Sequence, residues 1–241
     1  MTTIWAHRGA SADAPENTLS AFELAVEQGA DGVELDVQLT SDGEVVVCHD
    51  ETIDRTSDGS GAIATMTLDE LRRHDFSNGM AGYAGTTIPT LREVYELLAP
   101  TGMVINVELK NTIEAYPGLE EAVEALTATM NLTGRVVYSS FNHLSLRSIA
   151  GAGTQVRLAA LHQDMLCEPW RYAADVGLQA LHPYWGMVIR MPEYVEQAHA
   201  LGLAVNVWTV DEPEHLRAVA AAGVDAIITN VPARAREVLA G

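Results

Sequence analysis

The chain has 241 residues, 48% of them hydrophobic, so it is long enough to bury a large core as a single domain. Its formal net charge of −19 argues against nucleic acid as a partner, because a phosphate backbone requires a basic face, and it opposes stable association with an anionic membrane surface. No apolar stretch of the sequence approaches the ~20 residues that span a bilayer.

The N-terminus and the two cysteines both favour a cytoplasmic location. The N-terminus leads directly into an apolar strand, without the basic and apolar regions of a signal peptide. The two cysteines, Cys48 and Cys167, lie in apolar or strand-end contexts and show neither a disulfide framework nor a zinc spacing. We therefore expect reduced, buried thiols and a cytoplasmic location.

Apolar runs of strand length alternate with segments of helical periodicity along the chain. The expected strands are 3–6, 32–37, 103–109, 135–139, 157–161, 178–182, 203–208 and 225–229. The expected helices are 18–28, 91–98, 119–130, 144–150, 193–200, 214–221 and 233–239, whereas 168–176 has no clear pattern. About eight strand–helix units indicate an α/β fold of the (β/α)8 TIM-barrel type. The rival is an open doubly wound sheet, which is disfavoured because no glycine-rich phosphate loop follows the first strand.

One segment breaks this alternation. Residues 45–48 have the pattern of a strand, but only Ser41-Asp42-Gly43-Glu44 separate them from the strand before, too few residues for a crossover helix. We therefore expect an antiparallel hairpin with an Asp-Gly turn. Residues 42–89, in which only 68–73 look helical, are interpreted as an insertion after the second barrel strand, within one barrel domain of residues 1–241. Such insertions lie over the active-site face of a barrel.

Acidic side chains gather toward the carboxyl ends of two expected strands. Glu34 and Asp36 are two positions apart and share one face of their strand, and Asn106, Glu108 and Lys110 share one face of another. The three carboxylates would repel one another unless a cation lies among them, and oxygen ligands favour Mg²⁺ or Ca²⁺ over zinc. We therefore expect one divalent cation, Mg²⁺ or Ca²⁺, with Mn²⁺ as a further candidate. The alternative is a solvated strand end held by ordinary ion pairs.

Two histidines end strands near these carboxylates. His7 ends the first strand and His49 ends the hairpin return, so the two imidazoles are candidates for a general base and a general acid, although a lone strand-end histidine is more often structural. Arg8 and Lys110, the one lysine among 14 basic residues, are candidates for contacts with phosphate oxygens.

Two aromatic residues are candidates for the wall of the same pocket. Trp208 ends one expected strand and Phe141 follows another, so each could pack on a glycerol or head-group moiety. The alternative for Trp208 is a core side chain that caps the barrel. Among the remaining histidines, His182 is the best placed to line the pocket.

The motifs that hold these residues occur in a specific order and spacing. They are His7-Arg8-Gly9, Pro15-Glu16-Asn17-Thr18, Glu34-Leu35-Asp36, Thr40-Ser41-Asp42-Gly43, His49-Asp50, Arg55-Thr56, Ile88-Pro89-Thr90-Leu91, Glu108-Leu109-Lys110, Ser140-Phe141, Trp208-Thr209-Val210 and Gly223-Val224-Asp225. Over essentially its whole length the chain resembles the glycerophosphodiester phosphodiesterase family.

The resemblance implies a TIM barrel with a small insertion and a reaction that hydrolyses glycerophosphodiesters to sn-glycerol 3-phosphate and an alcohol. It also implies specific roles: a divalent cation on Glu34, Asp36 and Glu108, acid–base catalysis by His7 and His49, and phosphate contacts from Arg8 and Lys110. Which imidazole is the base, and whether water or the substrate's own 2-hydroxyl attacks, stay open, as do the head group and the oligomeric state.

Two other functions are compatible with the same barrel. A related phospholipase acting on lysophospholipids would need apolar side chains at the mouth, for which the insertion offers only scattered candidates, namely Ile63, Met66, Phe76, Met80 and Tyr83. A non-catalytic barrel that binds glycerol phosphate is the third possibility, but every position that the resemblance marks as catalytic is filled.

Overall fold

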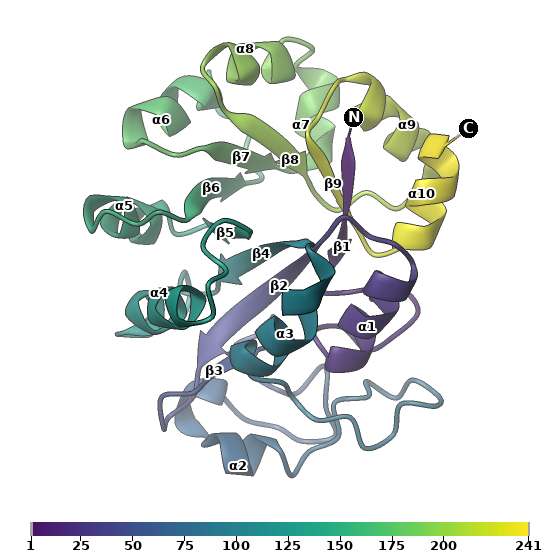
Figure 1. Cartoon of the computed structure of the whole chain (residues 1–241), viewed down its shortest axis with the longest axis vertical. Helices are drawn as coiled ribbons and strands as arrows, with labels where there is room; N and C mark the ends of the chain where they lie inside the picture. Colours follow the sequence, from purple (N-terminus) through teal and green to yellow (C-terminus); the bar gives the residue numbers. More distant parts are fainter. Residues whose placement is uncertain (1, 241) are drawn as a thin grey trace.

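Eight parallel strands close into a barrel in the computed structural model, which describes residues 2–240 (Figure 1). These strands are β1 (Thr3–His7), β2 (Gly32–Leu39), β4 (Val104–Leu109), β5 (Val136–Ser140), β6 (Arg157–His162), β7 (Ala180–Pro183), β8 (Ala204–Val207) and β9 (Ala226–Thr229). They pair in the order β1-β9-β8-β7-β6-β5-β4-β2, and pairing of β1 with β2 closes the ring. The predicted (β/α)8 TIM barrel is therefore confirmed.

Helices surround this barrel (Figure 1). They are α1 (Leu19–Glu27), α3 (Leu91–Leu98), α4 (Leu119–Thr129), α5 (His143–Gly151), α6 (Pro169–Val176), α7 (Trp185–Arg190), α8 (Tyr194–Ala200), α9 (Pro213–Ala221) and α10 (Pro232–Ala240), with a 3-10 turn η2 (Ala99–Thr101) after α3. The elements predicted from the sequence agree with these bounds to within two residues. Residues 2–240 contain no helix with the length and apolar character needed to cross a membrane.

Two helices were not expected from the sequence. Helix α6 forms in the segment without a clear pattern: Pro169 occupies its first turn, and Trp170 and Ala173 are its buried side chains. Helix α7 follows β7 directly and has only six residues. With only six residues, α7 is too short for the periodicity of apolar residues to identify it.

Strand alternation separates the apolar core from the polar interior of the barrel. Val33, Leu35 and Val37 are completely buried and belong to the same cluster as Phe22 of α1 and Leu91 of α3. The intervening side chains of β2 must therefore point into the barrel, where a smaller apolar cluster fills the centre. Its members are Trp5, Val137, Ala159, Ala180, Ala226 and Ile228.

The hairpin predicted after β2 is present. Strand β3 (Val45–Val47) pairs antiparallel with β2, and Val37, Gln38 and Leu39 face Val47, Val46 and Val45. The segment that follows contains η1 (Ile63–Thr65) and α2 (Leu68–Leu71). It packs around a separate small core of Val46, Cys48, Ile53, Ile63, Leu71, Phe76 and Ile88.

The cysteines differ from expectation in one respect. Both are free, and Cys48 is buried in the small core, but Cys167 is exposed. Cys167 lies between β6 and α6, where the neighbouring Met165 and Leu166 are also exposed. The apolar character of this sequence therefore does not reflect burial.

Candidate active site

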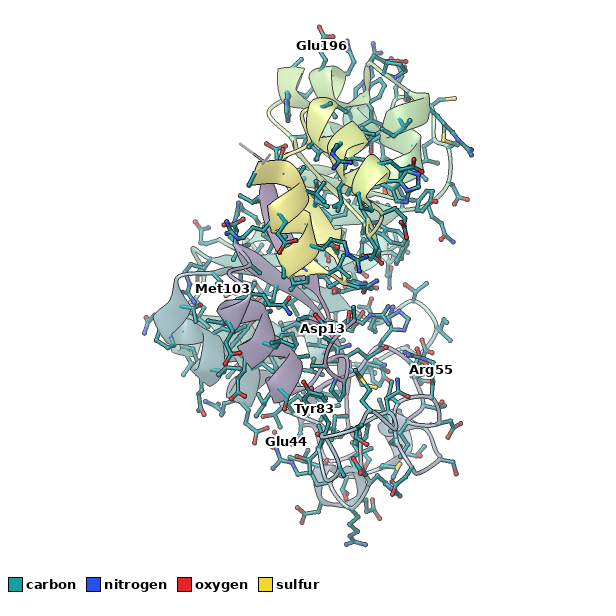
Figure 2. The ribbon with its side chains drawn as sticks, turned by 90° about the vertical axis from the view of Figure 1, so that its right-hand side faces the viewer. Asp13, Glu44, Arg55, Tyr83, Met103 and Glu196 are labelled. Atoms are coloured by element: carbon teal, nitrogen blue, oxygen red, sulfur yellow. The ribbon has the colours of Figure 1, made fainter. Side chains whose placement is uncertain are left out.

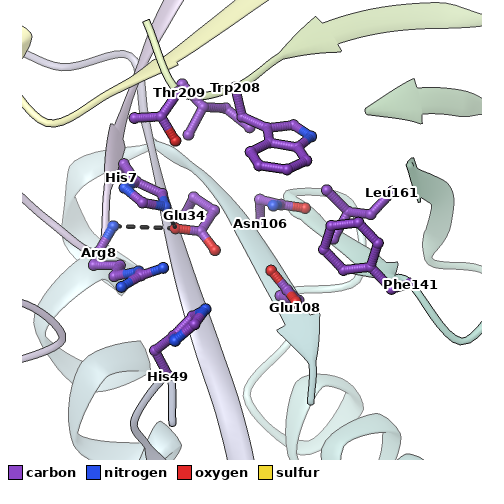
Figure 3. Close-up of a pocket in the computed structure, with 11 residues that line it drawn as sticks. His7, Arg8, Glu34, His49, Asn106, Glu108, Phe141, Leu161, Trp208 and Thr209 are labelled. Atoms are coloured by element: carbon purple, nitrogen blue, oxygen red, sulfur yellow. Dashed lines mark hydrogen bonds and ion pairs between the residues drawn. The ribbon is translucent and has the colours of Figure 1, made fainter. Parts of the chain in front are cut away.

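A pocket opens at the carboxyl ends of the barrel strands (Figure 3). Its lining comes from several strands and from the loops that follow them: His7, Arg8, Glu34, His49, Asn106, Glu108, Phe141, Leu161, Trp208, Thr209 and Ile228. Seven of the nine residues predicted for the site are in this lining. The other two, Asp36 and Lys110, contact it: Lys110 Nζ lies 2.9 Å from Glu108 Oε1, and Asp36 Oδ2 lies 3.3 Å from Arg8 Nε.

The three predicted carboxylates converge. Glu34, Asp36 and Glu108 are all buried, and each offers an oxygen within 4.8 Å of the other two. Two oxygens that bind one Ca²⁺ ion lie at most about 5 Å apart, because each metal–oxygen distance is ~2.3–2.6 Å. In addition, Asp36 Oδ1 is buried without a hydrogen-bond partner. The cluster therefore fits a hard divalent cation in donor type, spacing and unsatisfied acceptors.

Burial of this cluster makes it electrostatically costly without a cation. Burial, together with Asp36 and Glu108, raises the pKa of Glu34 well above its ordinary value. Burial and the Asp36 charge likewise raise the pKa of Glu108 to about 7, against the opposing effect of Lys110. Burial also acts to raise the pKa of Asp36, but the charges around it, first Arg8, outweigh burial and lower that pKa to about 2. A bound cation would lower the pKa of both glutamates, because it stabilises their charged forms.

His7 is held by an amide from the far end of the chain. Its Nδ1 lies 2.7 Å from Asn230 Oδ1, while Asn230 Nδ2 donates to Asp211 Oδ2 at 2.6 Å. Because the Asn230 amide donates to Asp211, its oxygen faces His7, and the imidazole proton lies on Nδ1. The free Nε2 is 3.9 Å from Glu34 Oε2. Burial, with a contribution from Arg8, lowers the pKa of His7 to about 4.

His49 reaches the pocket from the segment after β3. Its Nδ1 lies 2.6 Å from Asp50 Oδ1, so the proton lies on Nδ1 and points at the carboxylate. Its Nε2 accepts from Lys110 Nζ at 3.2 Å. Lys110 therefore joins His49 to Glu108 across the mouth of the pocket.

Arg8 lies between the carboxylates and the outer rim. Its backbone N–H donates to Glu34 Oε2 at 3.1 Å, the bond drawn in Figure 3. Its guanidinium pairs with Glu16 at 2.9 Å and with Asp36 at 3.3 Å. The side chain thus presents positive charge beside the acidic cluster, while Asn17 Nδ2 donates to Asp36 Oδ2 from the other side at 2.9 Å.

Aromatic side chains form the opposite wall of the pocket. The rings of Phe141 and Trp208 pack edge to face with centroids 5.6 Å apart. Trp208 Nε1 donates to the carbonyl of His182 at 2.7 Å, which fixes the indole. The sequence suggested that His182 lines the pocket, but it does not. It is completely buried, with Nε2 2.9 Å from Asn206 Nδ2, because its strand turns the side chain into the barrel centre.

Several residues of the site were not identified from the sequence. Asn106 lines the pocket, and both atoms of its buried amide lack a protein partner. Its position on one strand face with Glu108 was the available signal. Asp50 lies within a motif but its contact with His49 depends on side-chain rotamers. Asn230 and Asp211 follow β9 and β8, and no spacing in the sequence brings them to His7.

Comparisons with known proteins agree with this geometry. Residues 7–234 match the glycerophosphoryl diester phosphodiesterase family. A glycerophosphodiester phosphodiesterase of Caldanaerobacter subterraneus subsp. tengcongensis is 44% identical over 232 residues, which cover 96% of this chain and 95% of that protein. Another from Bacillus altitudinis is 39% identical over 237 residues, which cover 98% and 97%.

A solved structure is similar over the whole chain. An Oleispira antarctica phosphodiesterase, in complex with the product sn-glycerol-3-phosphate, superposes with a TM-score of 0.87 at 29% identity, covering 100% of this chain and 98% of that one. This chain therefore belongs to the glycerophosphoryl diester phosphodiesterase family, and the resemblance of its motifs to that family is confirmed.

Proposed function

We propose that the chain is a metal-dependent glycerophosphodiester phosphodiesterase, which hydrolyses glycerophosphodiesters to sn-glycerol 3-phosphate and an alcohol. The observation that carries the proposal is the convergence of two imidazoles and three buried carboxylates on one pocket. Membership of the family and the product bound to the Oleispira relative support the class of substrate.

In this proposal Glu34, Asp36 and Glu108 hold one Mg²⁺ or Ca²⁺ ion, with Mn²⁺ as a third candidate. A bound divalent cation would neutralise phosphate charge and lower the pKa of a nearby hydroxyl. Arg8 and Lys110 are the protein cations beside it, and they contact the remaining phosphate oxygens. Such local positive charge is necessary because the net charge of −19 repels an anionic substrate.

The two histidines transfer the protons. Since an oxygen holds Nδ1 of each ring, Nε2 is the atom that faces the pocket in both His7 and His49. One imidazole takes a proton from the attacking hydroxyl at Nε2, and the other, protonated at Nε2, delivers its proton to the departing alkoxide. Phe141 and Trp208 pack against the glycerol or head-group carbons, which orients the diester between the imidazoles.

We propose the same division of the chain as from the sequence: one barrel domain over 1–241, with 42–89 as an insertion that brings His49 over the barrel mouth. Three contacts support it. Arg55 of this segment pairs with Glu16, and Gln38 Nε2 donates to the carbonyls of Cys48 and His49 at 3.1 Å.

The test is release of sn-glycerol 3-phosphate from glycerophosphocholine. We expect turnover by the purified protein, its loss after chelation, and its recovery on addition of one of Mg²⁺, Ca²⁺ or Mn²⁺. Activity that persists after complete chelation would exclude metal dependence. Absence of activity on a panel of glycerophosphodiesters with all three ions would exclude the proposed reaction.

A specific observation keeps the lysophospholipid alternative as a second candidate. The apolar residues of the insertion named above are buried or half-buried, but other apolar side chains are exposed in segments that follow β4 to β7. Ile113 is 80% exposed and Leu144 is 68% exposed. Met165 and Leu166, after β6, and Tyr184, after β7, are also exposed. These segments are on the catalytic face of a barrel, where an acyl chain would lie.

Rates on glycerophosphocholine and lysophosphatidylcholine distinguish the two candidates. We expect faster hydrolysis of glycerophosphocholine and no effect of Leu144→Ser on that rate. Preference for lysophosphatidylcholine, lost in Leu144→Ser but retained in Leu201→Ser, would favour the second candidate. Leu201 is a suitable control because it is 48% exposed and precedes β8, at the opposite end of the barrel.

A further inference from the structure

A chain of ion pairs follows the rim of the pocket from His49 to Arg8. His49 Nδ1 contacts Asp50 Oδ1, and Arg55 donates to the two oxygens of Asp50 from Nε at 2.7 Å and Nη2 at 3.1 Å. The other edge of the same guanidinium donates to Glu16 from Nη1 at 2.7 Å and Nη2 at 2.8 Å. Glu16 Oε1 in turn accepts from Arg8 Nη1 at 2.9 Å.

Arg55 is the central member of this chain, and it is not part of the pocket lining. Figure 2 shows it at the side of the molecule where the segment after β3 borders the barrel. It joins two parts of the sequence, because Glu16 precedes it by 39 positions and lies in the loop between β1 and α1. The signs of charge alternate along the chain from Arg8 through Glu16 and Arg55 to Asp50, whose Oδ1 contacts Nδ1 of His49.

We propose that Arg55 is a positioning residue that fixes His49, through Asp50, and Arg8, through Glu16, in one common geometry. The proposal rests on the proposed function, in which His49 transfers a proton and Arg8 binds phosphate. Arg55 then couples the acid–base side of the pocket to its phosphate-binding side, although it contacts neither the substrate nor the cation.

The fork of the guanidinium is what this role requires. Four donations from one planar group reach two carboxylates, each in a bidentate manner, and such geometry sets angles as well as distance. A lysine at the same position would keep the charge, but its ammonium is a point charge that cannot hold both carboxylates in a plane. Replacement by lysine therefore separates positioning from simple charge compensation.

The contribution of Arg55 to stability is expected to be small. Its side chain is 43% exposed, so solvent screening limits what even its bidentate ion pairs contribute to the free energy of unfolding. Loss of Arg55 should therefore disturb the geometry of the site much more than the stability of the fold. Arg72 is a matched control. It lies in the same segment, 42–89, as Arg55, it also pairs with a carboxylate, that of Glu93, and its side chain is 35% exposed.

The kinetic test uses Arg55→Lys, Arg55→Gln and Arg72→Gln. We expect both Arg55 variants to lose about 10- to 100-fold in kcat/KM for glycerophosphocholine, the range of a misplaced catalytic group, with a change in Tm below about 4 °C. Arg72→Gln should retain full activity. Full activity of Arg55→Lys would overturn the role of the fork.

A double-mutant cycle tests the coupling itself. Glu16 and Asp50 share Arg55 as their common partner, so Glu16→Gln and Asp50→Asn should be non-additive. If each replacement costs about 10-fold in kcat/KM, the double variant should lose about 10- to 30-fold in place of about 100-fold. In an Arg55→Lys background the two losses should multiply. Losses that multiply in both backgrounds would contradict the proposal.

A measurement without substrate separates this proposal from the proposed function. We expect Glu16→Gln to shift the imidazole resonances of His49 in ¹H–¹⁵N NMR spectra, and Arg55→Lys to abolish that response. This result would support Arg55 as the connection even if no diester were hydrolysed, in which case only the proposed function would fail. His49 resonances that ignore Glu16→Gln in both backgrounds would overturn the proposal, whatever the enzyme hydrolyses.

Discussion

The placement of Arg8 in the site depends on the backbone conformation of Arg8 and Gly9. Both have left-handed backbone conformations, with φ of 55° for Arg8 and 81° for Gly9. A Cβ at position 9 would lie 2.6 Å from Cβ of Ala21, far inside van der Waals contact with α1. The glycine therefore lets the chain turn against α1 and directs Arg8 to the carboxylates.

Gly9→Ala is expected to lower the free energy of unfolding by about 2–4 kcal/mol, because the strained φ and the clash with α1 add together. Gly43→Ala is the control: its φ is 85°, but no atom lies within 4 Å of the added carbon, so a loss of only about 1 kcal/mol is expected. Urea denaturation of both variants provides the comparison. Equal losses would show that the contact with α1 is unimportant.

The tautomer of His7 depends on Asp211, which fixes the direction of the Asn230 amide. Asp211→Asn keeps the shape of the side chain but can turn an NH₂ group toward Asn230, which favours a flipped amide and a proton on Nε2 of His7. We expect kcat for glycerophosphocholine to fall about 10- to 100-fold with little change in KM. Asp225→Asn, beyond the opposite end of β9, is the control. Unchanged kcat in Asp211→Asn would show that Asp211 does not set the tautomer of His7.

Among the elements, α3 begins with a complete capping box in its own sequence, as α2 also does. Thr90 accepts from the backbone N–H of Glu93, and Glu93 accepts from the backbone N–H of Thr90. Thr90→Ala should lower the free energy of unfolding by about 1 kcal/mol without affecting catalysis. Thr129→Ala at the exposed C-terminal end of α4 should change it by less than about 0.5 kcal/mol. Comparable effects in chemical denaturation would show that the cap is not specific.

The elements also show which structure could be predicted from sequence. Strand β2 and helix α3 were predicted because the spacing of apolar residues is a local signal. The antiparallel direction of β3 followed from the length of its connection alone. Helix α6 was missed because the exposed Tyr172 is apolar as well as the buried Trp170 and Ala173, which obscures the helical period in the sequence. The exposure of Cys167 could not be predicted either, because it depends on how the loop packs and not on the neighbouring residues in the sequence.

The site could be predicted in part for a related reason. Glu34 and Asp36 share a strand face, and parallel pairing of β2 with β4 places Glu108 beside Asp36, so strand geometry was sufficient. The partners of the two imidazoles required tertiary structure. Asn230 is 223 positions from His7, and only closure of the barrel between β9 and β1 makes them neighbours.

For the whole molecule, buried histidines link stability to pH. Burial, with smaller effects of His162 and Arg157, lowers the pKa of His182 to about 3 from an ordinary value of 6.5. The unfolded chain therefore binds a proton that the folded chain excludes between these pH values. This linkage is absent above pH 6.5, and it lowers the free energy of unfolding progressively as the pH falls below that value.

The variant His182→Asn removes this linkage. Its free energy of unfolding should lie below that of the parent at pH 7, and the difference should shrink by about 1–2 kcal/mol at pH 5, since each unit of pH contributes up to about 1.4 kcal/mol per proton. Urea denaturation at pH 7, 6 and 5 gives the result. Taking the difference in free energy of unfolding between the variant and the parent cancels the contributions of the other titrating groups, including His7 and the buried carboxylates. A difference that is independent of pH would show that His182 accepts its proton in the folded state.

At the same scale, a chain of net charge −19 must place positive charge where an anionic substrate binds. Arg8 and Lys110 supply two charges at the mouth, and the carboxylates between the imidazoles are proposed to attract a third charged group, the cation. Anomalous diffraction from crystals grown with Mn²⁺ tests this directly. We expect one strong peak within bonding distance of Glu34, Asp36 and Glu108, which Asp36→Asn weakens. An active protein whose crystals show no peak there, or a peak only elsewhere, would contradict it.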